Sequence, residues 1–142
     1  MRASLSHARL LAAALVVAAT AAIGASSALA TSATTNANGM SVTASLSPDN
    51  VSSTSGVVSE LARVTNTSSS AESLAIRIIG PVPTSVPLTI FTKLQPSASF
   101  TRSVSFPAPL LKPGTHTLTV IAVKRVSVPS QPVQATASIK VD

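Results

Sequence analysis

Residues Val133–Val141 read VQATASIKV, and every second residue in this stretch is apolar. Successive side chains of an extended chain point to opposite faces, so the apolar and polar residues separate onto two faces. The apolar face would hold Val133, Ala135, Ala137, Ile139 and Val141, and the polar face Gln134, Thr136, Ser138 and Lys140. This alternation is typical of a β-strand that buries one face and exposes the other.

The same alternation recurs in six segments nearer the N-terminus, separated by Pro, Gly, Ser and Asn residues that favour turns. These predicted strands are Ser41–Leu46, Val57–Thr65, Glu72–Ile79, Leu88–Leu94, Ser99–Phe106 and Thr115–Lys124. Nothing after the first thirty residues shows the spacing of an amphipathic helix. We therefore expect an all-β fold, a seven-stranded antiparallel immunoglobulin-like β-sandwich at residues 41–142. A small β-barrel is the alternative.

Three features of these strands depart from simple alternation. Glu60 interrupts the apolar face of its strand, and Arg102 shares the phase of apolar neighbours such as Phe100. We expect a β-bulge or a position at a sheet edge at Arg102, where a charge is tolerated. Ile121 and Val123 predict a second, partly covered face on their strand.

Residues 1–30 have the layout of a secretory signal peptide. Arg2 and Arg9 supply a positive start, an apolar run extends from Leu10 to Ile23, and the segment ends in Ala28-Leu29-Ala30. We expect cleavage after Ala30 and a secreted, extracellular or cell-envelope protein of bacterial type. The alternative is a retained membrane anchor, although the apolar run is shorter than the roughly 20 residues that a spanning helix needs.

The segment that follows the expected cleavage site, residues 31–40, is predicted to be a flexible N-terminal tail. Thr31–Gly39 reads TSATTNANG, which is small, polar and without periodicity.

Composition excludes several classes of function. The 142-residue chain contains no Cys, Trp or Tyr, three Phe, two His and four acidic residues. Disulfides, thiolate metal sites and a cysteine nucleophile are impossible, and aromatic stacking of sugars or bases is disfavoured. The net charge of +6 comes from scattered basic residues, so no nucleic-acid site is expected. Those outside the leader are Arg63, Arg77, Lys93, Arg102, Lys112, Lys124, Arg125 and Lys140.

Catalytic chemistry is equally poorly represented. His116 is the single His after the leader, and the acids Asp49, Glu60, Glu72 and Asp142 are scattered along the sequence. We therefore expect no enzyme activity, no catalytic or cofactor-binding residues and no metal site. Asn50-Val51-Ser52 and Asn66-Thr67-Ser68 match the glycosylation acceptor pattern, but we interpret both as turns. Asp49 with Asn50 offers too few carboxylates for calcium.

Two motifs resemble bacterial extracellular immunoglobulin-like modules of the CARDB-like and fibronectin-type-III-like kinds. Val64–Ser70, followed by Leu74–Ile78, is similar to a hairpin between their second and third strands, and Leu111–Val120 to the entry of their penultimate strand. The resemblance covers roughly residues 41–141 and implies a spacer, adhesin or accessory role. These modules carry a core Trp or Tyr, which implies that Phe91, Phe100 and Phe106 fill that space here.

The expected function is a non-enzymatic, secreted or cell-surface structural or interaction module that binds a protein or an envelope polymer. The alternative is a polar ligand- or glycan-binding domain. Residues Val133–Val141 offer an edge for strand addition by a partner, but Lys140, Pro129 and Pro132 are typical of a guarded edge. The sequence leaves the ligand, the binding face and the oligomeric state open.

Overall fold

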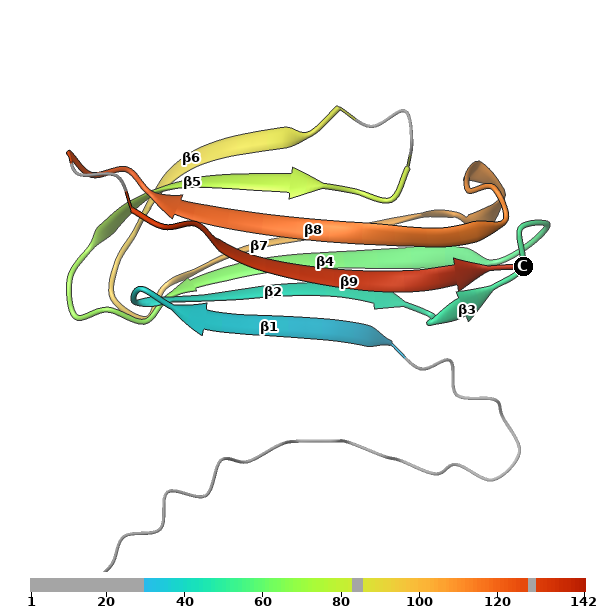
Figure 1. Ribbon diagram of the computed structural model, residues 1–142, viewed down its shortest axis with the longest axis horizontal. Helices are drawn as coiled ribbons and strands as arrows, with labels where there is room; N and C mark the ends of the chain where they lie inside the picture. Colours follow the sequence, from blue (N-terminus) through green and yellow to red (C-terminus); the bar gives the residue numbers. More distant parts are fainter. Residues whose placement is uncertain (1–29, 83–85, 128–129) are drawn as a thin grey trace, which may run out of the picture.

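The computed structural model describes residues 30–82, 86–127 and 130–142, and these form a sandwich-like arrangement of two open β-sheets (Figure 1). The described residues hold nine strands and one 3₁₀ turn, η1 (Ala108–Leu110). The strands are β1 (Thr31–Ala37), β2 (Met40–Ser47), β3 (Asn50–Val51), β4 (Val57–Asn66), β5 (Glu72–Ile79), β6 (Leu88–Leu94), β7 (Ser99–Pro107), β8 (Gly114–Lys124) and β9 (Val133–Val141).

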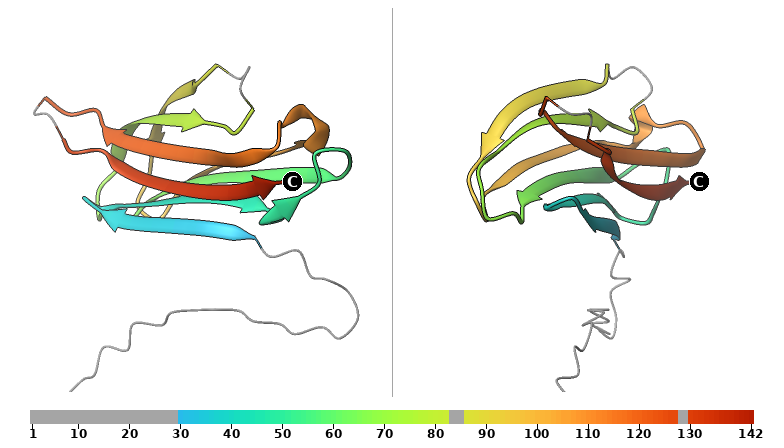
Figure 2. Two further views of the ribbon diagram at one scale, coloured as in Figure 1. Left: turned by 45° about the vertical axis from the view of Figure 1, so that its right-hand side comes forward. Right: turned by 60° about the vertical axis from the view of Figure 1, so that its left-hand side comes forward.

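The strand order is β1-β2-β4-β7 in one sheet and β3-β9-β8-β5-β6 in the other. Neighbouring strands are antiparallel except for the short parallel pair β3 and β9. The two sheets lie face to face in both views of Figure 2. Because neither sheet closes on itself, the barrel alternative is wrong.

Each of the seven predicted strands is present, with ends that differ by a residue or so. The count of seven is wrong, because β1 and β3 were not expected. β3 lies where the sequence indicated a turn and a loop, and its two residues are too few to show any alternation.

The prediction of a flexible tail at residues 31–40 is also wrong. β1 pairs with β2 along its whole length, from Thr31 opposite Leu46 to Ala37 opposite Met40. Asn38 and Gly39 join the strands with φ of 53° and 71°, the left-handed conformation that a two-residue hairpin turn requires. β1 is largely exposed at the sheet edge, so no apolar alternation marked it.

The core lies between the sheets and consists mainly of the apolar faces predicted from alternation, to which the structure adds Met40 from the expected tail and Val51 from β3. Its largest fully buried side chains are Met40, Leu46, Leu74, Ile76, Leu118, Ile139, Val42, Val58, Val64, Val120, Val133 and Val141. Full burial of one such aliphatic side chain contributes about 1.5–3 kcal/mol. Phe100 and Phe106 pack against this core. Phe91 does not fill core space as expected, because it is 64% exposed on the outer side of β6.

Within the described ranges, no helix has the length and hydropathy needed to cross a membrane.

Candidate interaction surface

The outer face of β6, β5 and β8 carries an apolar row that runs across the three strands. Phe91 on β6 lies opposite Ala75 on β5, and Ala75 lies opposite Val123 on β8. In the next row Arg77 lies between Thr89 and Ile121. We call these outward-facing residues, together with Lys93, Ser73 and Arg125, the β6–β5–β8 face.

This face results from the alternation of inward- and outward-pointing side chains along each strand. In β5, Leu74, Ile76 and Ile78 are buried in the core, so Ala75 and Arg77 must point outward. β6 reverses the usual arrangement, since its single aromatic residue, Phe91, lies on the exposed side and Ile90 on the inner side. The second face that the sequence indicated at Ile121 and Val123 is therefore real, and both residues are half-buried.

Arg125 and Phe91 hold each other in place on this face. The Arg125 guanidinium carbon lies 4.7 Å from the centre of the Phe91 ring, and the Arg125 backbone N–H donates to the Ser73 carbonyl oxygen at 2.8 Å. A cation over an exposed aromatic ring contributes about 0.5–1 kcal/mol. Arg125 therefore favours this position of the ring, although most of the ring surface meets solvent.

All charged side chains on the face are basic: Arg77, Lys93 and Arg125. All four acidic residues of the chain lie in its described part, and none belongs to this face. Three ion pairs occur among the described residues, and their cations, Arg102, Lys124 and Lys140, all lie outside the face. The face thus has basic groups beside an apolar row and no internal counter-charge.

The two charges that interrupted the inward pattern pair with each other between the sheets. Arg102 on β7 forms an ion pair with Glu60 on β4 through Nη1 and Oε1. β7 is an edge strand of its sheet, as expected for Arg102, and its pairing with β4 continues without a bulge. The pair therefore compensates two charges, neither of which alone would suit the core side of a strand.

A cleft of about 230 Å³ opens beside this ion pair. Its walls are mainly aliphatic, with Ile78, Leu88 and Val104 among them, and the charged groups in its lining are Glu60 and Arg102. This volume is below the usual range of ligand pockets, and the two charges neutralise each other. The cleft therefore makes a weaker candidate site than the exposed face.

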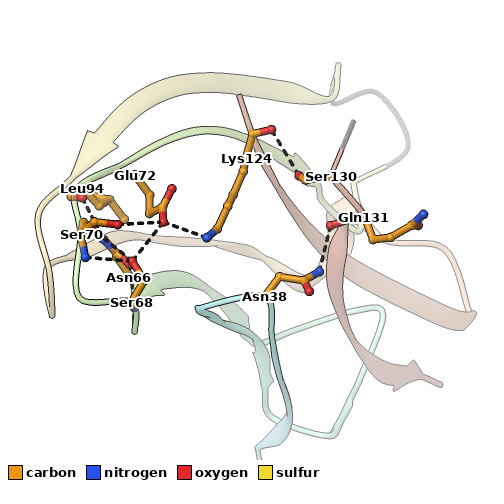
Figure 3. A network of polar contacts seen from close by, with 9 residues as sticks. All are labelled: Asn38, Asn66, Ser68, Ser70, Glu72, Leu94, Lys124, Ser130 and Gln131. Atoms are coloured by element: carbon orange, nitrogen blue, oxygen red, sulfur yellow. Dashed lines mark hydrogen bonds and ion pairs between the residues drawn. The ribbon is translucent and has the colours of Figure 1, made fainter. Parts of the chain in front are cut away.

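A network of polar contacts at one end of the sandwich is structural (Figure 3). The buried Asn66 side chain donates to the carbonyl oxygens of Ser70 at 2.7 Å and Leu94 at 3.0 Å. Its Oδ1 accepts hydrogen bonds from the Ser68 backbone N–H and hydroxyl at 2.9 and 2.8 Å. Asn66 is therefore the last residue of β4 rather than part of the turn that the sequence indicated, and its buried amide holds the turn that follows.

Glu72 connects this network to the opposite strand. Lys124 Nζ donates to Glu72 Oε1 at 2.8 Å, and the Ser68 hydroxyl donates to the same atom at 3.1 Å. The hydrogen bond from Lys124, supported by those from Ser68 and Ser70, holds the pKa of Glu72 below its ordinary value despite partial burial. Nearby, Asn38 Nδ2 donates to the Gln131 carbonyl oxygen at 3.3 Å, which joins the β1–β2 turn to the β8–β9 connection.

The side chains that could act in catalysis or bind a metal ion do not lie together in one site. His116, near the start of β8, has its Nε2 2.6 Å from the Lys112 carbonyl oxygen in the preceding connection. Asn50 is an exposed residue of β3, and the Asp49 carbonyl oxygen accepts from the Lys140 backbone N–H. Across residues 30–82, 86–127 and 130–142, no group of three His, Asp or Glu side chains is placed to hold a metal ion.

The outer edge of β9, where strand addition was considered, is partly covered. β3 pairs with its last residues, Lys140 and Val141, and Thr31 Oγ1 of β1 donates to the Ser138 carbonyl oxygen at 2.6 Å. Pro129, one of the expected guards, lies outside the described residues, whereas Pro132 immediately precedes β9.

No protein-family model matches the chain, and a search of curated proteins finds no match to its sequence.

Proposed function

We propose that this protein is an exported, non-enzymatic module of immunoglobulin-like type, which works at the cell surface or in the medium by binding another macromolecule. The strand order supports the immunoglobulin-like assignment. β2-β4-β7 corresponds to strands A, B and E of such domains, and β9-β8-β5 to G, F and C. β6 then extends the second sheet beside β5, as an additional strand does in the variable-type domains.

Export is supported by the position of β1 relative to the expected cleavage site. β1 starts at Thr31, immediately after the expected cleavage site at Ala30. The Thr31 hydroxyl donates a hydrogen bond to the Ser138 carbonyl oxygen. Cleavage there would leave every residue of the β1–β2 hairpin in the exported chain.

The observation that carries the binding role is the β6–β5–β8 face. Phe91 is a large aromatic side chain at 64% exposure, and Arg125 stacks over its ring at 4.7 Å. Exposed apolar groups bordered by polar ones are typical of interaction sites on soluble domains. The scattered positions of His116 and the four acids support a binding role over catalysis.

The test compares what the exported form retains from the envelope and medium fractions of the producing cell. We expect immobilised wild-type protein to retain a defined component, and Phe91→Ser to retain at least five-fold less. Leu110→Ser in η1 is the matched control, because Leu110 is 56% exposed but lies outside the face. Equal retention by all three proteins, or none by the wild type, would refute the proposed role. Retention of a purified glycan alone would favour a glycan-binding domain instead.

A further inference from the structure

We propose that the β6–β5–β8 face binds an acidic surface of another protein, one that presents aliphatic side chains bordered by carboxylates. This proposal rests on the binding role given above and adds the chemistry of the partner. It follows from three properties of the charges on the face: they are all basic, they lie on both sides of the apolar row, and the face holds no acidic residue.

The spacing of the face places the cations on both sides of the apolar row. Side chains two residues apart on a strand are separated by about 6.8 Å, and neighbouring strands by about 4.8 Å. Arg77 follows Ala75 by two residues on β5, and Lys93 follows Phe91 by two residues on β6. Carboxylates that border an apolar contact would therefore meet basic groups well within the roughly 8 Å screening length of physiological salt.

The charges also exclude a second copy of this chain as the preferred occupant. A two-fold contact would place the same patch on both partners, and here it would bring a face whose charges, Arg77, Lys93 and Arg125, are all basic against a second such face. No acid on the face offers compensation. Like charges brought together in this way oppose association.

The apolar row favours a protein over an anionic polymer. Burying Phe91, Ala75 and Val123 of the row, together with Ile121 in the next row, against other apolar groups lowers the free energy. A polyanionic wall polymer offers charge but little aliphatic surface, so it would leave this row solvated. Arg125 is already held over Phe91, which lowers the entropy that it loses on binding.

The test is a nuclear magnetic resonance titration of the exported form with a cyclic β-hairpin peptide that carries Leu and Val bordered by four Glu. We expect the amide signals of Ala75, Phe91 and Val123 to shift, and the apparent affinity to fall as salt rises. Arg77→Gln should weaken binding about two- to five-fold, the usual range for one exposed charge pair. Arg63→Gln, which removes an exposed cation from β4, should leave affinity unchanged.

Three results would overturn the proposal. The first is binding of the same peptide with Lys in place of Glu, and the second is an absence of shifts on the face. The third is equal or tighter binding of polygalacturonate, an acidic polysaccharide without aliphatic side chains, which would make the partner a polymer. If the face still governs retention of an envelope component while the acidic peptide fails to bind, the binding role stands and only this account of the partner fails.

Discussion

Replacing Arg102 by methionine removes the cation that compensates Glu60 on the core side of β4. The Glu60 side chain is 7% exposed and that of Arg102 is 34% exposed. Breaking a fully buried ion pair costs about 3–5 kcal/mol, because the remaining charge stays desolvated. Since Arg102 reaches solvent, we expect a smaller loss of about 2–3 kcal/mol. That is a substantial part of the 5–15 kcal/mol that stabilises a typical domain.

Urea unfolding of the exported form measures this loss of free energy. In a thermal melt, the melting temperature should fall by about 8–12 °C, at about 4 °C per kcal/mol. The double variant Glu60→Leu with Arg102→Met should return to within about 1 kcal/mol of the wild type, because an apolar pair suits the site. Arg63→Met serves as the control on the outer face of the same strand, with an expected change below about 0.5 kcal/mol.

The reasoning is refuted if Arg102→Met alone costs less than about 0.5 kcal/mol, or if the double variant is no more stable than Arg102→Met. Either result would mean that Glu60 is well solvated without Arg102. The ion pair would then not be needed for the stability of the domain.

Three further expectations concern the end of the sandwich that Figure 3 shows. Gly39→Ala should destabilise the domain by about 1–2 kcal/mol in urea unfolding, because φ is +71° and the new Cβ would lie 3.0 Å from Ser68 Cβ; unchanged stability would contradict the turn geometry. Asn66→Ala should cost about 1–3 kcal/mol by the same assay, since the buried Leu94 carbonyl oxygen loses its amide donor while the more exposed Ser70 carbonyl oxygen keeps the Ser68 hydroxyl, and a cost below 1 kcal/mol would show that water replaces the amide. The lowered pKa of Glu72 means that its contribution is complete above the ordinary value of 4.5 and is lost as pH falls through the lower, folded-state value. Thermal melts from pH 7 to pH 2 should therefore show a shallower acid decline in Glu72→Gln, and superimposable curves would refute the role of the Lys124 contact.

Seven strands could be predicted because each buries one face against a core that both sheets share. Alternation fails where burial is absent, and β1 shows this most clearly. Its small polar residues lie mostly exposed at an edge, so the available signal was the Asn38-Gly39 pair, which favours a hairpin regardless of the flanking residues. That dipeptide, together with the β2 pattern after it, was sufficient to find the strand.

Contacts between residues far apart in the sequence could not be predicted from alternation. Glu60 and Arg102 were each identified as anomalies, but their contact joins residues 42 positions apart and depends on the register of β4 with β7. The exposed position of Phe91 was visible from its phase relative to Leu88, Ile90 and Leu94. The expectation that an aromatic residue must fill the core prevailed over that phase and was wrong. The outer face was foreseen only in part, through Ile121 and Val123.

The central claim is that the β6–β5–β8 face contacts the partner, and photocrosslinking in the producing cell tests it most directly. Benzoylphenylalanine in place of Phe91 keeps an aromatic ring at the exposed position, and the same group at Leu110 is the control. We expect ultraviolet light to produce a discrete adduct from position 91, and none from position 110, with loss of the adduct when Arg77→Gln and Lys93→Gln are added. Equal adducts from both positions, or an adduct from position 110 alone, would contradict the account.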